Sequence, residues 1–165
     1  MQGRDSGQNN IAFPSVRHPT SCILTMKLSA KTEYACLAML QMAQQYSSGE
    51  PLQIRRIADE QGIPSRFLVQ ILLQLKGASL VASTRGAAGG YRLARPPREI
   101  SLAEVIDVME GDARPGTNAG KRTALVAALL GLCRELSEAQ RDRLEDTSLA
   151  DLAERATRRE PMWYI

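Results

Sequence analysis

The chain has 165 residues, of which 44% are hydrophobic and 24% are charged, as expected for one globular domain with a sizeable core. Cys22, Cys36 and Cys133 are widely spaced and His18 is the only histidine, so neither a disulfide framework nor a metal site within one chain is predicted. No apolar run approaches the roughly 20 residues of a membrane helix, and the first 25 residues lack the apolar core of a signal peptide. We therefore expect a cytoplasmic protein with no membrane partner.

Positive charge is concentrated in one segment, although the formal net charge of the chain is only +3. Residues 62–98 contain no acidic residue and six basic ones: Arg66, Lys76, Arg85, Arg92, Arg95 and Arg98. A polyanion such as nucleic acid would be attracted to this segment.

The chain opens with residues 1–25, which show no sustained periodicity and which we expect to form a disordered arm before a domain that starts near Met26. A first helix is predicted from about Ala30 to Tyr46, because Ser29 can cap it. A second, short helix is predicted within residues 52–62, with Gly62 suited to the left-handed position beyond its end.

A third helix is predicted after the sequence GIP, with Ser65 as its cap. Its apolar residues recur at helical spacing and form one buried stripe: Leu68, Ile71, Leu72 and Leu75. Its other face carries mostly polar side chains and no carboxylate: Ser65, Arg66, Val69, Gln70 and Gln74. Two short helices joined by a tight turn are typical of a helix-turn-helix.

The glycine-rich sequence TRGAAGGYR, residues 84–92, lies between two predicted short strands, LVASTR and YRLA. It is not a P-loop, because Tyr91 and Arg92 follow Gly90 where Lys and Ser or Thr are needed. It is not a dinucleotide-binding turn either, because it leads into a strand instead of a helix. We predict the tip of a wing whose small residues let backbone amides and Arg85 reach phosphates or a narrow minor groove.

Three segments follow the predicted wing. Ser101 and Glu104 have the spacing of a capping box, which predicts a short helix that ends at Gly111 and closes the domain. A polar loop at 112–122 leads into a long helix from about residue 123, and Ser148 with Asp151 indicates a last capped helix. The long helix carries one stripe that we expect to form a dimer seam: Leu125, Leu129, Leu132 and Leu136.

These elements predict a mainly α fold with a small β-hairpin, in which a winged helix-turn-helix domain is joined to a long dimerisation helix. The domain spans residues 26–111, the dimerisation helix and a short C-terminal helix span 123–160, and 161–165 form a tail. No catalytic constellation is found, since the only histidine lies in the expected arm. We therefore expect a DNA-binding protein and not an enzyme.

The segment from Met26 to Gly111 resembles the Rrf2 family of bacterial winged-helix regulators. The resemblance rests on several motifs in the right order: MKLSAKTEYA, IADEQGIPSRFLVQILLQL, STRGAAGGYRLARPP and ISLAEVI. It implies a homodimeric transcription factor that binds a partly palindromic operator on double-stranded DNA, usually as a repressor.

The resemblance also implies roles for individual residues. The amino-terminal segment and first helix would contact the phosphate backbone through Lys27, Lys31 and Tyr34. The third helix would enter the major groove with Ser65, Arg66 and Gln70, where Arg66 could read guanine and Gln70 adenine. In the minor groove the wing would present Arg85, on a hairpin shaped by Gly86, Gly89, Gly90 and Tyr91.

Three departures from the family pattern are visible. Val69 stands where the family commonly has Glu, so the operator preference should differ, because valine can only contact a thymine methyl group. Ser79 replaces a glycine at a helix end that often needs a positive φ, at a cost of about 1 kcal/mol unless Gly77 provides the turn earlier. Cluster-binding members place three cysteines before the dimer helix, whereas residues 111–123 contain none, so we expect no cofactor.

The signal that the protein senses is left open by the sequence. Cys133 is a candidate redox thiol near the dimer seam, but a small apolar core residue is the favoured interpretation, because free cysteine is commonly buried. Control by an unidentified effector or partner protein is another alternative. A second kind of function, a winged-helix adaptor that acts chiefly through its long helix, also fits the sequence.

Overall fold

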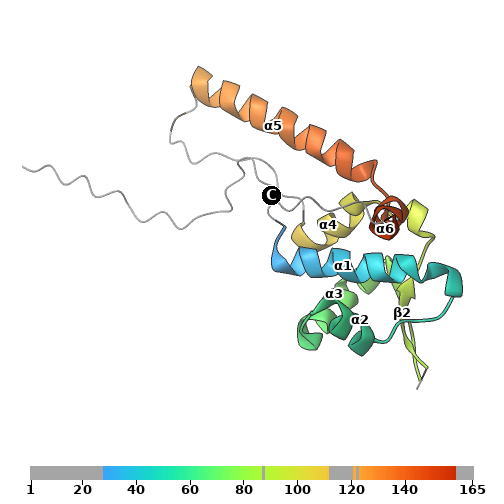
Figure 1. Cartoon of the computed structure of the whole chain (residues 1–165). Helices are drawn as coiled ribbons and strands as arrows, with labels where there is room; N and C mark the ends of the chain where they lie inside the picture. Colours follow the sequence, from blue (N-terminus) through green and yellow to red (C-terminus); the bar gives the residue numbers. More distant parts are fainter. Residues whose placement is uncertain (1–27, 87, 112–120, 122, 159–165) are drawn as a thin grey trace, which may run out of the picture.

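The computed structural model describes residues 28–86, 88–111, 121 and 123–158. Within them the fold is mainly helical with one antiparallel hairpin, which confirms the predicted fold class (Figure 1). The elements, in chain order, are α1 (Ala30–Gln44), η1 (Tyr46–Ser48), α2 (Ile54–Gln61), α3 (Ser65–Gly77), β1 (Val81–Thr84), β2 (Gly90–Leu93), η2 (Pro97–Glu99), α4 (Leu102–Glu110), α5 (Ala124–Glu145) and α6 (Leu149–Thr157). The expected arm 1–25, the tail 161–165 and nearly all of the loop 112–122 lie outside the described residues.

The first helix, α1, is the centre of the core. Ser29 caps it by accepting a hydrogen bond from the backbone N–H of Thr32, as the sequence predicted. Small side chains at Ala35 and Ala38 are fully buried and let neighbouring helices approach closely, so α1 contacts α2, α3, α4 and α6. In Figure 1, α4 and α6 lie on one side of α1, and α2 and α3 lie on the other.

The predicted helix-turn-helix is formed by α2 and α3. Gly62 ends α2 in the left-handed region with φ of 65°, as predicted. The apolar stripe of α3 is buried in the core that α1 helps to form, and it consists of Leu68, Ile71, Leu72 and Leu75. The opposite face of α3 is therefore turned toward solvent.

One cap in this motif differs from the prediction. Pro64, and not Ser65, is the N-cap of α3, and its carbonyl accepts hydrogen bonds from the backbone N–H groups of Phe67 and Leu68 at 2.9 and 3.2 Å. Ser65 is the first helical residue and its side chain makes no capping hydrogen bond. Proline occupies the cap because its φ of −60° and ψ of 121° already have the extended geometry of that position.

The segment 81–93, which we call the wing, is an antiparallel hairpin in which Val81 pairs with Leu93 and Thr84 with Gly90. The segment before α2 supports the wing, because the backbones of Leu52 and Tyr91 exchange two hydrogen bonds of 2.8 Å. A Cβ atom at Gly90 would clash with the carbonyl oxygen of Leu52, which explains glycine at that position.

The end of α3 leads into the wing through a Schellman motif. The backbone N–H groups of Ser79 and Leu80 donate to the carbonyls of Lys76 and Leu75. Ser79 has φ of 60°, so the turn falls on this serine and not on Gly77, which belongs to the helix.

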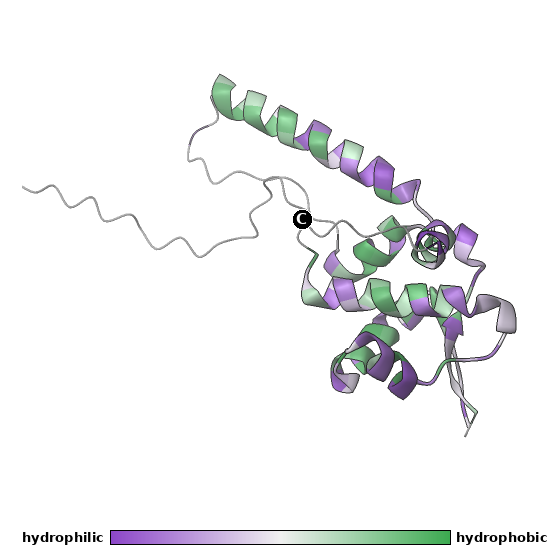
Figure 2. Cartoon of the chain, in the orientation of Figure 1, coloured by the Kyte–Doolittle hydropathy of each residue, from purple (hydrophilic) through white to green (hydrophobic). Residues whose placement is uncertain are grey.

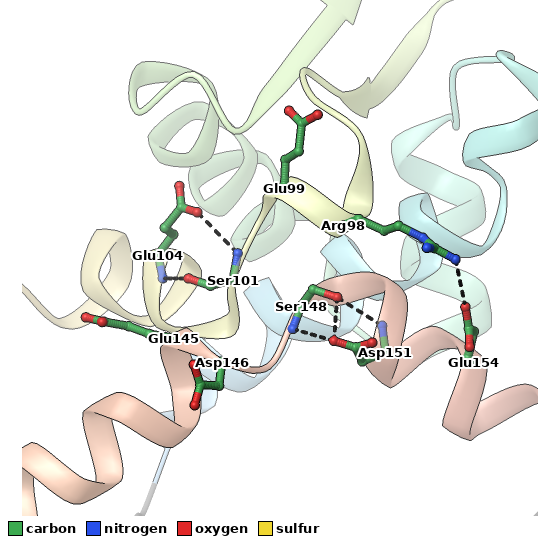
Figure 3. Close-up of a pocket in the computed structure, with 9 residues that line it drawn as sticks. All are labelled: Arg98, Glu99, Ser101, Glu104, Glu145, Asp146, Ser148, Asp151 and Glu154. Carbon is green, nitrogen blue, oxygen red and sulfur yellow. Dashed lines mark hydrogen bonds and ion pairs between the residues drawn. The ribbon is translucent and has the colours of Figure 1, made fainter.

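The two predicted capping boxes are both present, at the starts of α4 and α6. They meet at one junction, where the backbone N–H of Leu102 donates to the carbonyl of Thr147 and that of Leu149 donates to the carbonyl of Ile100. Figure 3 shows the hydrogen bonds of both boxes together with the Arg98–Glu154 ion pair, whose charged atoms lie 3.6 Å apart. This junction fastens the turn between α5 and α6 to the start of α4.

The sequence grouped α6 with the dimerisation helix, whereas the structure packs α6 on α1 as part of the winged domain's core. Leu149 is fully buried and Ala153 nearly so. The last helix therefore completes the winged domain and leaves α5 as an arm that projects from it (Figure 1).

The long helix α5 has no buried residue along its 22 positions. Its first half is strongly hydrophobic and its second half is hydrophilic (Figure 2). None of the described helices has both the length and the apolar character needed to cross a membrane.

Candidate nucleic-acid interface

The exposed face of α3 carries three of the residues that the resemblance assigns to DNA. Ser65, Arg66 and Gln70 are all exposed, because the stripe on the opposite face is buried against the core. Val69 is half-buried beside them. Such a helix, polar and exposed along one side, has the form that enters a major groove.

The wing presents Arg85 at the beginning of its tip, where the side chain is exposed. Gly86 has φ of 109°, a conformation that other residues rarely adopt. A Cβ at Gly89 would collide with the carbonyl oxygen of Thr84, so the tip stays narrow only with glycine. Tyr91 is partly buried against the core and pairs with Ser83, next to the last strand pair before the tip.

A direct contact joins the two candidate DNA-binding elements. The Nζ atom of Lys76, in the last turn of α3, donates a hydrogen bond of 2.7 Å to the Oγ of Ser83 in β1. Both side chains are exposed, so the contact orients the wing relative to α3 without burying charge.

The six basic residues of the segment 62–98 divide into two groups. Arg95 forms an ion pair with Glu104 at 2.5 Å, and Arg98 pairs with Glu154. The other four are exposed and contact no carboxylate within the described part of the chain: Arg66, Lys76, Arg85 and Arg92. All four lie on α3 or the wing, and α3 lies on the opposite side of α1 from α4 and α6 (Figure 1).

The start of α1 carries two of the three residues that the resemblance assigns to the phosphate backbone. Lys31 is exposed, but its Nζ donates to the carbonyl of Met109 at 3.4 Å, near the end of α4. Tyr34 is half-buried and packs on the core. Lys27 lies outside the described residues.

One exposed side chain near the site was not singled out from the sequence. Phe67 on α3 is 51% exposed, and the guanidinium carbon of Arg66 lies 5.1 Å from the centre of its ring. The sequence could have pointed to Phe67, because it is an aromatic residue outside the buried stripe and directly follows Arg66, the candidate base-reading arginine.

The leucine stripe of α5 is exposed along its whole length. The exposed fraction falls from 84% at Leu125 to 44% at Leu136, toward the end that is attached to the domain. That end is held by Arg141, which donates two hydrogen bonds to Asp107 of α4 and one to Glu145.

The two cysteines within the described residues lie on different helices. Cys133 is partly exposed on α5, and Cys36 is buried in α1. Burial, followed by the nearby carboxylate of Glu110, raises the pKa of the Cys36 thiol to about 11.

Comparison with known proteins decides the family. A family model described as "Rrf2: Iron-dependent Transcriptional regulator" matches residues 28–155. The chain belongs to the Rrf2 family. A Mycobacterium tuberculosis protein named as an HTH-type transcriptional regulator is 42% identical to this Rrf2 regulator over 132 residues, which cover 78% of this chain and 81% of the relative.

Two further similarities extend this result. IscR of Vibrio parahaemolyticus, named as an HTH-type transcriptional regulator, is 34% identical over 138 residues and 77% of each chain. The structure of CymR, the global cysteine regulator of B. subtilis, matches with a TM-score of 0.71 and 30% identity over 79% of this chain and 98% of CymR. The resemblance stated from the sequence motifs is therefore confirmed, and with it the assignment as a transcriptional regulator.

The family description names iron, and the donor residues that the structure describes do not fit an iron site. Residues 111–123 contain neither cysteine nor histidine. No group of three or more His, Cys, Asp or Glu side chains within the described ranges could hold a metal ion. Iron–sulfur clusters need thiolates, and the raised pKa of Cys36 disfavours its thiolate form.

Proposed function

We propose that this Rrf2 regulator is a homodimeric repressor that binds a partly palindromic operator without an iron–sulfur cluster. The observation that carries the proposal is the group of four exposed cations on α3 and the wing that contact no carboxylate among the described residues. Phosphate contacts give most of the affinity of proteins for DNA, and unpaired Lys and Arg are the residues that make them.

The residue roles that we propose are those implied by the resemblance to the family, and the exposure of the α3 residues supports them. In the major groove, Arg66 donates to guanine O6 and N7, and Gln70 forms paired hydrogen bonds with adenine. Ser65, which is exposed beside them, contacts a neighbouring group of the DNA in the same groove. The wing places Arg85 in the minor groove. The backbone phosphates are contacted by Lys31 and Tyr34 of α1 and by Lys27, which precedes that helix in the sequence.

The dimer is proposed from the exposed apolar stripe of α5. Leucines that are 44 to 84% exposed in one chain form an apolar face that is usually covered in the functional assembly. A second copy of α5 would cover it, because the stripe has the alternating spacing of four and three of a helix-pairing seam. The hydrogen bonds from Arg141 to Asp107 would then set the position of each DNA-binding domain relative to the seam.

In vitro selection of DNA from a random pool, followed by capture of bound genomic fragments, tests this proposal. We expect a partly palindromic motif whose half-sites are separated by about one helical turn or a multiple of it. The variant Gln70→Ala should relax the preference at one base pair per half-site by about 1 to 3 kcal/mol and leave the other positions unchanged. Recovery of no enriched motif would count against operator binding.

A further inference from the structure

The helix α3 exposes a large aromatic side chain that its core does not use. The core face of α3 is complete with its four buried residues, and Phe67 is 51% exposed. An aromatic side chain buries 150 to 250 Å² when it is enclosed, so leaving half of it in water forgoes much of the stabilisation that Phe could give. Phe67 is therefore poorly explained as a packing residue.

The contact that Phe67 does make is with a neighbouring cation. The guanidinium of Arg66 lies over its ring at 5.1 Å from the centroid, within the range of a cation–π interaction. An arginine side chain has many rotamers, and an aromatic surface that holds its guanidinium reduces the entropy lost when the planar fork binds a base. The residue next to Phe67 is the one to which the proposed function assigns guanine.

We propose that Phe67 is a specificity-determining residue, which positions Arg66 on a guanine and contacts the methyl group of an adjacent thymine. This inference rests on the proposed function, because it requires α3 to lie in a major groove. The thymine methyl is the apolar group that projects into that groove, and an exposed phenyl ring at the start of the helix fits it. Arg66 and Phe67 would thus read one two-base step, guanine beside thymine.

Base analogues in the selected operator test this pairing directly. Replacing thymine by uracil removes only the methyl group, and replacing guanine by 7-deazaguanine removes one acceptor for Arg66. For the wild type we expect the uracil substitution beside the Arg66 guanine to weaken binding about fourfold, since one buried carbon group is lost. For Phe67→Ala we expect weaker binding to the natural operator and no further loss on the uracil operator.

The positioning role has its own readout. The loss caused by Arg66→Ala should be about two- to fivefold smaller in the Phe67→Ala background than in the wild type, which corresponds to an exposed cation–π contact. Phe67→Leu keeps an apolar side chain without an aromatic face, so it should keep the uracil penalty and lose the coupling to Arg66. Leu73→Ala is the matched control, because Leu73 is 50% exposed on the same helix and lies about two helical turns after Arg66.

The outcomes separate this inference from the proposed function. If the wild type binds its operator but Phe67→Ala shows the same uracil penalty and the same Arg66→Ala loss as the wild type, the inference is wrong and operator binding stands. If the wild type selects no DNA, both fail. An unchanged thermal unfolding midpoint in Phe67→Ala excludes misfolding as the cause of weaker binding.

Discussion

Leu52 and Tyr91 exchange two backbone hydrogen bonds of 2.8 Å, which join the segment before α2 to the second strand of the wing. The neighbouring Gly90 lies so close to Leu52 that a Cβ would clash with its carbonyl oxygen. The direction of the wing is therefore set by its contact with the backbone of Leu52 as well as by its own turn.

Gly90→Ala should displace the wing. We expect a loss of about 1 to 3 kcal/mol in the free energy of unfolding, because backbone atoms must move to admit the methyl group. Operator affinity should fall as well, since Arg85 would be misplaced. The control is Gly77→Ala, where no atom lies within 4 Å of the added Cβ, so denaturant unfolding should show no loss of stability.

Ser79→Gly should stabilise the protein. Ser79 has φ of 60° at the end of α3, a conformation that costs a residue with a Cβ about 1 kcal/mol and costs glycine little. Chemical denaturation should therefore show a gain of about 0.5 to 1 kcal/mol. Ser79→Ala retains the Cβ, and an equal gain in that variant would show that the left-handed backbone is not the cause.

Leu129→Glu should dissociate the proposed dimer. Leu129 is 58% exposed near the middle of the apolar stripe, and a carboxylate there would be desolvated at the seam. We expect the dimer dissociation constant to rise at least about tenfold in sedimentation equilibrium. Ala127→Glu adds the same charge to the opposite side of α5 and should leave the association unchanged. Equal behaviour of the two variants would place the seam elsewhere.

Cys36 should react slowly with thiol reagents in the folded protein. With a pKa raised to about 11 by burial and by Glu110, about one thiol in a thousand is ionised at pH 8. Alkylation followed by peptide mass spectrometry should label Cys133, which is partly exposed, well before Cys36. Raising the pH toward 11 should speed the Cys36 reaction. Equal labelling of Cys36 in folded and unfolded protein at pH 8 is the contrary outcome.

The sequence was most informative where a pattern is local. The buried stripe of α3, the left-handed Gly62 and the boxes at Ser101 and Ser148 follow from spacing within a few residues, and the structure contains each of them. The prediction that Ser65 caps α3 was wrong. Proline and serine both suit the start of a helix, and in the structure the helix begins one residue earlier than predicted, with Pro64 as the cap.

Long-range relationships could not be predicted in this way. The short amphipathic pattern of α6 shows that one face is buried, but it does not show that α1 is the partner. The pairing of Leu52 with Tyr91 joins residues far apart in the sequence. The sequence pattern around either residue does not show which residue it pairs with. The stacking of Arg66 on Phe67 depends on side-chain rotamers, which spacing does not specify.

The central claim is that DNA is bound through the uncompensated cations of α3 and the wing. Anisotropy titration of the selected operator at several salt concentrations tests it. The proteins are the wild type, Arg85→Ala and, as a control, Arg158→Ala, which changes an exposed arginine at the end of α6. We predict a steep, linear fall of log affinity with log salt, reduced in slope by about one in Arg85→Ala and unchanged in Arg158→Ala. An affinity independent of salt, or an Arg85→Ala variant that binds like the wild type, would contradict it.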